Sequence, residues 1–129
     1  MKIRFIIKES SSKVIDISVK GGDISGVIHY QNEFIENWIS MEKLIPFNYV
    51  LPVAIIKNIN VDPKYRGKGI GNKLMDKFFS AAEIANTICL IADTYEENLF
   101  NLVEWYESFG FEVVDLNNGC PLMIMEGDI

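Results

Sequence analysis

The sequence lacks the residues and segments that define several common classes of protein. Cysteine occurs only twice in 129 residues, at Cys89 and Cys120, which provides neither a disulfide framework nor a metal-ligand pair. Both lie among apolar neighbours, so we expect two buried free thiols in a reducing cytoplasm. No apolar run is long enough to span a membrane, and Lys2, Arg4 and Lys8 interrupt the N-terminal apolar stretch too often for a signal peptide. The sequence therefore predicts a cytoplasmic protein that contacts no membrane.

Basic residues are also scarce, at 12 Lys and Arg against 18 Asp and Glu, and the net charge of −6 argues against a nucleic-acid-binding surface. The basic residues are unevenly distributed. Between Lys57 and Lys77 six of them stand against two acidic residues, a local net charge of +4, so the rest of the chain carries −10. We interpret this segment as an anion site in an acidic surface that would attract cationic acceptors.

Hydrophobic patterning predicts one domain, residues 1–129, with mixed secondary structure. Runs rich in β-branched and aromatic residues predict strands over 2–8, 13–20, 24–30, 53–61, 87–92, 111–116 and 121–125. Turns are predicted at Gly21-Gly22-Asp23 and at Asn117-Asn118-Gly119. The strand 53–61 is expected to be central and largely buried.

Three segments have helical spacing of their apolar residues. The first, 33–45, is expected to end at Pro46, and the second covers 71–85. The third begins at a capping box, Thr94 to Glu97, runs to about Ser108 and is capped by Gly110. We expect one sheet with these helices packed on it.

The segment 65–71 combines glycines with basic residues at the start of the helix 71–85. Exposed backbone N–H groups and the helix dipole at such a turn favour an anion, and glycines let it approach closely. A P-loop sequence is absent, and Asn72 follows Gly71, so the third glycine of a dinucleotide fingerprint is misplaced. A plain turn does not require Arg66 and three alternating glycines.

The same segment resembles the acyl-CoA pyrophosphate loop of the GNAT-type N-acetyltransferase superfamily, V-x-P-x-x-R-G-x-G-I-G-x-x-L. The matching residues are Val61, Pro63, Tyr65, Arg66, Gly67, Gly69, Ile70, Gly71 and Leu74. Trp105 to Phe111 resembles the family's F-Y-x-x-x-G-F near the end of a later helix. The resemblance covers roughly 53–115; the N-terminal half agrees only in strand order and in Gly26.

The resemblance implies a GNAT-like α+β fold, with one mixed, mostly antiparallel sheet. It also implies a single N-acetyltransferase domain that uses acetyl-CoA as co-substrate and no metal. The family usually places two helices between its first two strands, and here only 9–12 lie there. The implied cofactor-binding residues are Ile59, Asn60, Val61, Arg66, Gly67, Lys68, Gly69, Ile70, Gly71 and Asn98, with Lys73 adding charge. The alternative is a catalytically silent acyl-CoA-binding or partner-binding module on the same fold.

Tyr106 is the residue we expect to act as general acid toward the CoA thiolate, because a phenol of pKa about 10 can protonate a thiolate whose conjugate acid lies near about 8.5. The base stays open. The strand 53–61 carries no carboxylate, which leaves four candidate side chains and a water relay. The four are His29, Glu42, Asp93 and Glu96.

The segment 32–52 is an addition to the family pattern and follows the predicted third strand. We hypothesise that its residues Phe34, Trp38, Met41 and Phe47 replace the missing acceptor wall. The acceptor is expected to be an amine on a small molecule or a protein, with no nucleic acid or membrane as partner. A homodimer stays open as the assembly.

Overall fold

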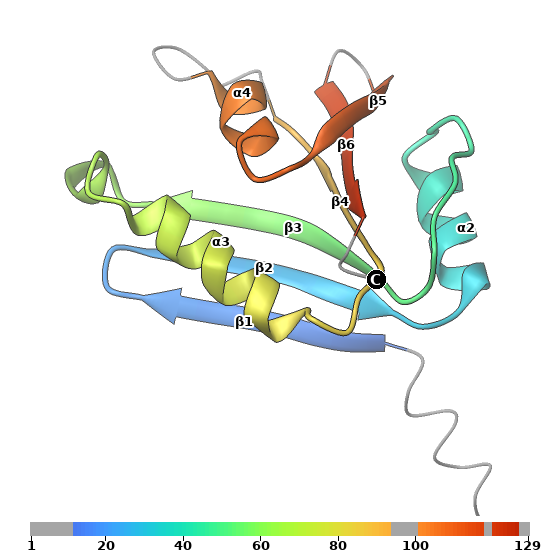
Figure 1. The fold of residues 1–129 in the computed structure, drawn as a ribbon, viewed down its shortest axis with the longest axis horizontal. Coiled ribbons are helices and arrows are strands. Elements are labelled where there is room, and N and C mark those ends of the chain that lie inside the picture. The colour runs from blue at the N-terminus through green and yellow to red at the C-terminus, as the bar shows by residue number, and fades with distance from the viewer. Residues whose placement is uncertain (1–11, 94–100, 118–119, 127–129) are drawn as a thin grey trace, which may run out of the picture.

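The computed structural model describes residues 12–93, 101–117 and 120–126, and they form a six-stranded sheet with helices on it (Figure 1). The strand order is β1-β2-β3-β4-β6-β5, antiparallel except for β3 and β4. The strands are β1 (Ser12–Val19), β2 (Gly22–His29), β3 (Val53–Val61), β4 (Thr87–Ile91), β5 (Glu112–Asn117) and β6 (Cys120–Glu126); the helices are α2 (Asn32–Met41), the short η1 (Pro63–Tyr65), α3 (Ile70–Ala81) and α4 (Leu102–Glu107). The predicted fold class is confirmed, and the predicted strand 2–8 lies outside the described residues.

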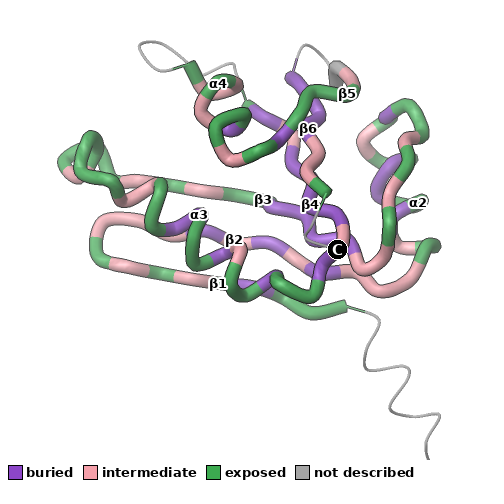
Figure 2. Tube along the Cα trace, in the orientation of Figure 1, coloured by how far each residue is buried: buried purple, intermediate pink, exposed green. Residues whose placement is uncertain are grey.

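The two faces of the sheet bury separate clusters, as alternation along each strand requires. Ala54 and Ile56 of β3 join the cluster under α3, which also includes Phe78. Val53 and Ile55 point to the other face, where they pack with Trp38 of α2 and its neighbours. Figure 2 shows the buried positions concentrated in the middle of the sheet. None of the helices in the described ranges has the length and apolar character of a membrane span.

The β1–β2 hairpin turns one residue earlier than predicted. The turn consists of Lys20 and Gly21, and Gly22 already pairs with Val19 as the first residue of β2. Gly21 takes a φ of +96°, which favours glycine. Gly22 is needed for a different reason, because a Cβ there would collide with the Asn60 carbonyl of β3. Two glycines in a row therefore serve a turn and a close strand contact, so the predicted turn over Gly21-Gly22-Asp23 was wrong in its position.

Helix α2 ends at Met41, four residues before the predicted end. Lys43 adopts a left-handed φ of 57°, and the N–H groups of Lys43 and Leu44 donate to the Ser40 and Ile39 carbonyls. This pair of hydrogen bonds is a Schellman motif, and the contact between Leu44 and Ile39 that accompanies it is buried. The helix therefore ends through its own capping bonds, and Pro46 plays no part in the stop.

The other two helices are also shorter than predicted. Helix α3 ends at Ala81 because the chain turns to let the Asn86 N–H donate to the Pro52 carbonyl. Helix α4 begins at Leu102, after Asn101, whose side chain accepts a hydrogen bond from the Glu104 N–H at 3.0 Å. Asn101 has extended backbone, so no helix runs through it from the predicted capping box, which lies outside the described residues.

The two central strands separate, and this feature positions the candidate site. β3 and β4 pair at only three positions, from Val53 with Thr87 to Ile55 with Cys89. Beyond these pairs β3 continues to Val61 while β4 turns toward α4 (Figure 1). A β-bulge at Lys57, which is skipped in the pairing with β2, marks the divergence. We call the opening between the diverging strands the notch.

Candidate functional site

The glycine loop between η1 and α3 lies beside the notch and exposes its backbone. Gly67 and Gly69 have φ values of 78° and 80°, so both adopt the left-handed conformation that favours glycine. A Cβ at either position would meet nothing within 4 Å. Gly69 is the N-cap of α3, and no side chain caps this end. The first N–H groups of α3 therefore have no side-chain acceptor, which suits an anion.

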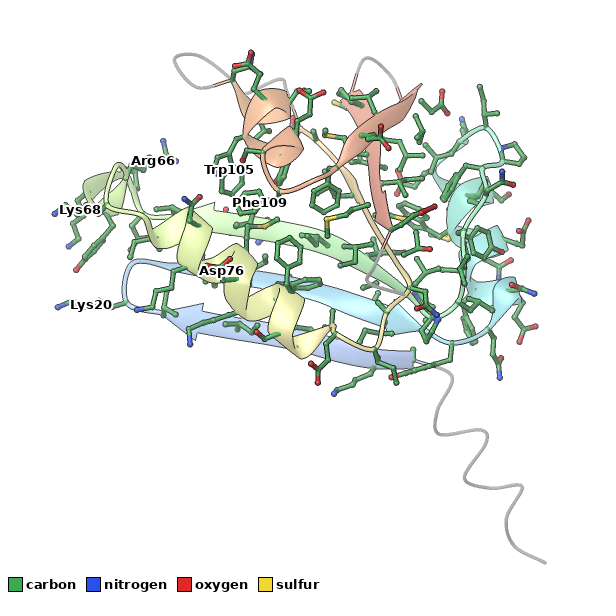
Figure 3. The ribbon with its side chains drawn as sticks, viewed as in Figure 1. Lys20, Arg66, Lys68, Asp76, Trp105 and Phe109 are labelled. Atoms are coloured by element: carbon green, nitrogen blue, oxygen red, sulfur yellow. The ribbon has the colours of Figure 1, made fainter. Side chains whose placement is uncertain are left out.

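Gly71 is required by helix packing rather than by the turn. A Cβ at Gly71 would lie 3.1 Å from the indole of Trp105 in α4. The same indole donates from Nε1 to Asn72 Oδ1 at 2.9 Å, which joins the two helices. Figure 3 shows Trp105 pointing from α4 toward α3. Sequence reasoning assigned Gly71 to the cofactor and did not find the bond from Trp105 to Asn72, because that pairing depends on the fold.

The basic residues of the loop lie around Tyr65. The ammonium groups of Lys64 and Lys68 are 5.6 and 5.7 Å from the centre of its ring. The Arg66 Nε donates to the Val61 carbonyl at 3.2 Å, which ties the loop to the end of β3. Arg66 and Lys68 are labelled at this end of the molecule in Figure 3. The positive charge predicted for the loop is thus gathered at the mouth of the notch.

The exposed half of β3 forms one wall of the notch. Four residues from Val53 are buried, whereas Lys57 and the residues after it are exposed or half-buried, so the prediction of a largely buried strand holds only for the first half. Ile59, Asn60 and Val61 pair with β2 on one side and have no strand partner on the β4 side among the described residues. The structure therefore leaves an open strand edge at the three residues expected to contact the cofactor.

Tyr106 lies on α4 with only 5% of its surface exposed. It shares a buried cluster with Ile56 and Leu90, which flank the point where the strands diverge, and its ring lies 6.0 Å from Phe111. Burial raises the pKa of the Tyr106 phenol to about 12. The phenol is therefore neutral at any pH near 7. Asn98, the other residue expected near this helix, lies outside the described residues.

A small depression of about 230 Å³ opens on the opposite face of the sheet, beside α2. Its lining residues are Trp38, Glu42, Ile55, Ile56, Lys57 and Ile91. Of the four predicted wall residues only Trp38 lines it. The ring of Phe34 stacks on that of His29 with 5.5 Å between the ring centres, and the rings of Phe47 and Trp38 pack edge to face with their centres 6.4 Å apart. The side chain of Met41 is 77% exposed. Sequence reasoning missed Lys57, because the bulge that brings it here depends on strand pairing.

The structure separates the candidate bases. His29 pairs with Val53 at the start of β3, away from the glycine loop, and its Nδ1 is buried without a hydrogen-bond partner. Burial and the charge of Lys57 lower the pKa of His29. Glu42 lines the depression, and Asp93 is exposed just after β4. Glu96 lies outside the described residues.

The described cysteine and acidic side chains provide no metal centre and no disulfide. Cys89 and Cys120 are both buried free thiols, as predicted. Burial raises the pKa of the Cys89 thiol to about 12. Within the described ranges, no group of three or more His, Cys, Asp or Glu side chains could hold a metal ion.

Two central strands that diverge therefore lie beside an uncapped, glycine-rich helix start. A family model described as an acetyltransferase (GNAT) domain matches residues 14–113. The chain therefore belongs to the GNAT acetyltransferases. No curated protein matches it in a sequence comparison.

Solved structures share the fold at low sequence identity. The anti-CRISPR protein AcrVA5 is 22% identical, with 88% of this chain and 98% of that chain covered and a TM-score of 0.57. A GNAT family acetyltransferase from Elizabethkingia anophelis with acetyl-CoA bound is 17% identical over 98% and 83%, with a TM-score of 0.55. The ribosomal-protein-S18-alanine N-acetyltransferase from Escherichia coli is 18% identical over 100% and 78%, with a TM-score of 0.54.

Proposed function

We propose that this acetyltransferase moves the acetyl group of acetyl-CoA to a primary amine by direct attack, in one domain and without a metal. The observation that carries the proposal is the glycine loop at the mouth of the notch, with Gly67 and Gly69 in the left-handed conformation and the start of α3 uncapped. The acetyl-CoA bound to the similar structure from Elizabethkingia anophelis supports the donor.

The donor's pyrophosphate binds to the N–H groups from Gly67 to Gly71, and Arg66 and Lys68 add positive charge. The open edge of β3 from Ile59 to Val61 pairs with the pantetheine amides as an added strand would. Ile70 supplies the first N–H of α3, and Asn98 is the proposed further contact. The open space in front of Gly67 and Gly69 supports this assignment, because no Cβ holds the ligand away.

In the transfer step the neutral amine nitrogen attacks the thioester carbonyl. The new C–N bond forms as the C–S bond breaks, the amine loses a proton to solvent through water, and the thiolate leaves. Tyr106 donates its hydroxyl proton toward the leaving sulfur. Its raised pKa keeps that proton in place wherever the amine is nucleophilic.

The same raised pKa limits how completely Tyr106 can act as an acid. Full transfer from a phenol of pKa about 12 to a thiolate of about 8.5 costs about 5 kcal/mol. Hydrogen-bond donation to the sulfur as charge develops is therefore the larger part of its contribution, and proton release from the attacking amine offsets the rest.

The acceptor amine belongs to a small molecule or a protein and enters from the α2 face. The acidic chain, at −6, favours a cationic acceptor over long range. The S18-alanine acetyltransferase similar in fold acts on a protein amine, which supports this class of acceptor.

Two measurements test the proposal. Acetyl-CoA should raise the melting temperature, and free-thiol release should depend on added amine and fall in Tyr106→Phe. Stabilisation by acetyl-CoA without thiol release from any amine would instead identify the silent binding module. Absence of stabilisation would refute a role of the glycine loop in cofactor binding.

A further inference from the structure

The depression beside α2 contains one side chain of each charge against an apolar wall. Lys57 supplies the cation and Glu42 the anion, while the indole of Trp38 lines the same hollow. Its volume of about 230 Å³ is below the range of about 300–1,000 Å³ for sites that enclose a drug-sized ligand, so it fits one end of an acceptor. The ammonium of Lys57 beside this apolar wall is complementary to a small group that carries a negative charge.

Lys57 is directed into this hollow by the backbone. It is the extra residue of the β-bulge, because Ser25 pairs with Asn58 and Gly26 pairs with Ile56. A bulge rotates a side chain away from the regular alternation of the strand. Since β3 diverges from β4 just past Ile55, the bulge places Lys57 at the edge of the notch.

Of the two charged side chains in the hollow, Glu42 already has an interaction partner. Within the described ranges Lys57 has no acidic side chain as an ion-pair partner. Burial, and after it the charge of Lys57, lowers the pKa of His29. Lys57 is exposed and in no ion pair with a described residue, so its ammonium is available to an external anion.

We infer that the acceptor is an amine that carries an anionic group close to its nitrogen, and that Lys57 binds this group. The inference rests on the proposed function, since it concerns the acceptor of that same reaction. Lys57 is then a specificity-determining residue. Long-range attraction by the acidic surface and local selection by Lys57 act on the two ends of one zwitterion.

Three matched pairs of acceptors isolate the anionic group: glycine, β-alanine and 4-aminobutyrate, each against its primary amide. Members of a pair have equal chain length and one amine, and kcat/KM is expressed per neutral amine, because the carboxylate also raises the amine's pKa. The ratio of kcat/KM is measured within each pair by thiol release, at saturating acetyl-CoA. Wild-type protein should prefer the acid in at least one pair by roughly fivefold, the upper range for a partly exposed ion pair.

The variants Lys57→Gln and Lys57→Glu should abolish and invert this preference, with acetyl-CoA's KM unchanged. Lys13→Glu, an exposed change of equal charge on β1, should leave it as in wild type. Equal preference in wild type, an unchanged preference in Lys57→Glu, or no turnover of all six amines would overturn the inference. Acetyl-CoA stabilisation of the same samples separates the two failures, because its loss would refute the proposed function itself.

Discussion

The two sides of the notch are built by different means. The glycine loop and α3 form a binding surface from backbone, with left-handed glycines and uncapped N–H groups. The α2 side is built from side chains, among them Trp38 of α2 and Lys57 of β3, and the loop that follows α2 is held by other side chains. Thr87 is an example of that support, because its hydroxyl bonds both the N–H and the carbonyl of Val50. The difference teaches that a backbone site can be stated as a short motif, whereas a side-chain site cannot.

The largest expected effect concerns the one side chain proposed to act chemically on the donor side. Tyr106→Phe should lower kcat about 100-fold or more, the usual contribution of a positioned acid, with little change in acetyl-CoA's KM. Tyr49→Phe is the matched control. Tyr49 also has its pKa raised to about 12, through burial and its bond to Glu36, but it lies on the α2 side. Equal losses of kcat in Tyr106→Phe and Tyr49→Phe would contradict the proposed difference between the two sides of the notch.

The hydroxyl of Thr87 should contribute measurably to the stability of the protein through the loop that follows α2. Thr87→Val keeps the shape but removes both bonds to Val50, so we expect a loss of about 2 kcal/mol in the free energy of unfolding. Denaturant unfolding measures it, with Thr87→Ser, which keeps the hydroxyl, as control. Stability equal to wild type in Thr87→Val would mean that other contacts hold this loop.

The two faces should also separate in their response to alkali. Burial raises the folded-state pKa of Cys89 from 9.0 and of Tyr106 from 10.0 to about 12 each. The unfolded chain therefore releases these protons first, and stability is lost as pH rises, from about 9 for Cys89 and from about 10 for Tyr106. Each group costs about 1.4 kcal/mol per pH unit within its window. Cys89→Ala should remove the earlier loss alone; an unchanged pH curve would contradict the assignment.

A smaller effect tests the backbone at the start of α3. Gly69→Ala places a side chain in the left-handed conformation and should cost about 1 kcal/mol of stability, although a Cβ there meets nothing. Gly69→Asn should cost less, because asparagine tolerates this conformation better. The melting temperatures of the free protein rank the three residues. Alanine ranked above asparagine would show that strain does not decide the choice of residue.

The same distinction explains what the sequence predicted. The predicted limits of β3 agree with the structure, because local spacing of the apolar residues encodes them. The predicted end of α2 was wrong, since the sequence around Lys43 carries no signal for the left-handed conformation that this residue adopts. The position of Lys57 and the bond from Trp105 to Asn72 depend on contacts between distant segments. Pattern alone could not supply them.

The central claim is that donor and acceptor bind on opposite sides of the notch, and steady-state kinetics of two variants tests it most directly. Trp38→Phe keeps an aromatic ring at this buried position of the core. Gly69→Ala should raise the KM of acetyl-CoA about tenfold and leave the KM of the amine within about twofold. Trp38→Phe should do the reverse. A variant that shifts both constants equally, or the opposite one, would contradict the account.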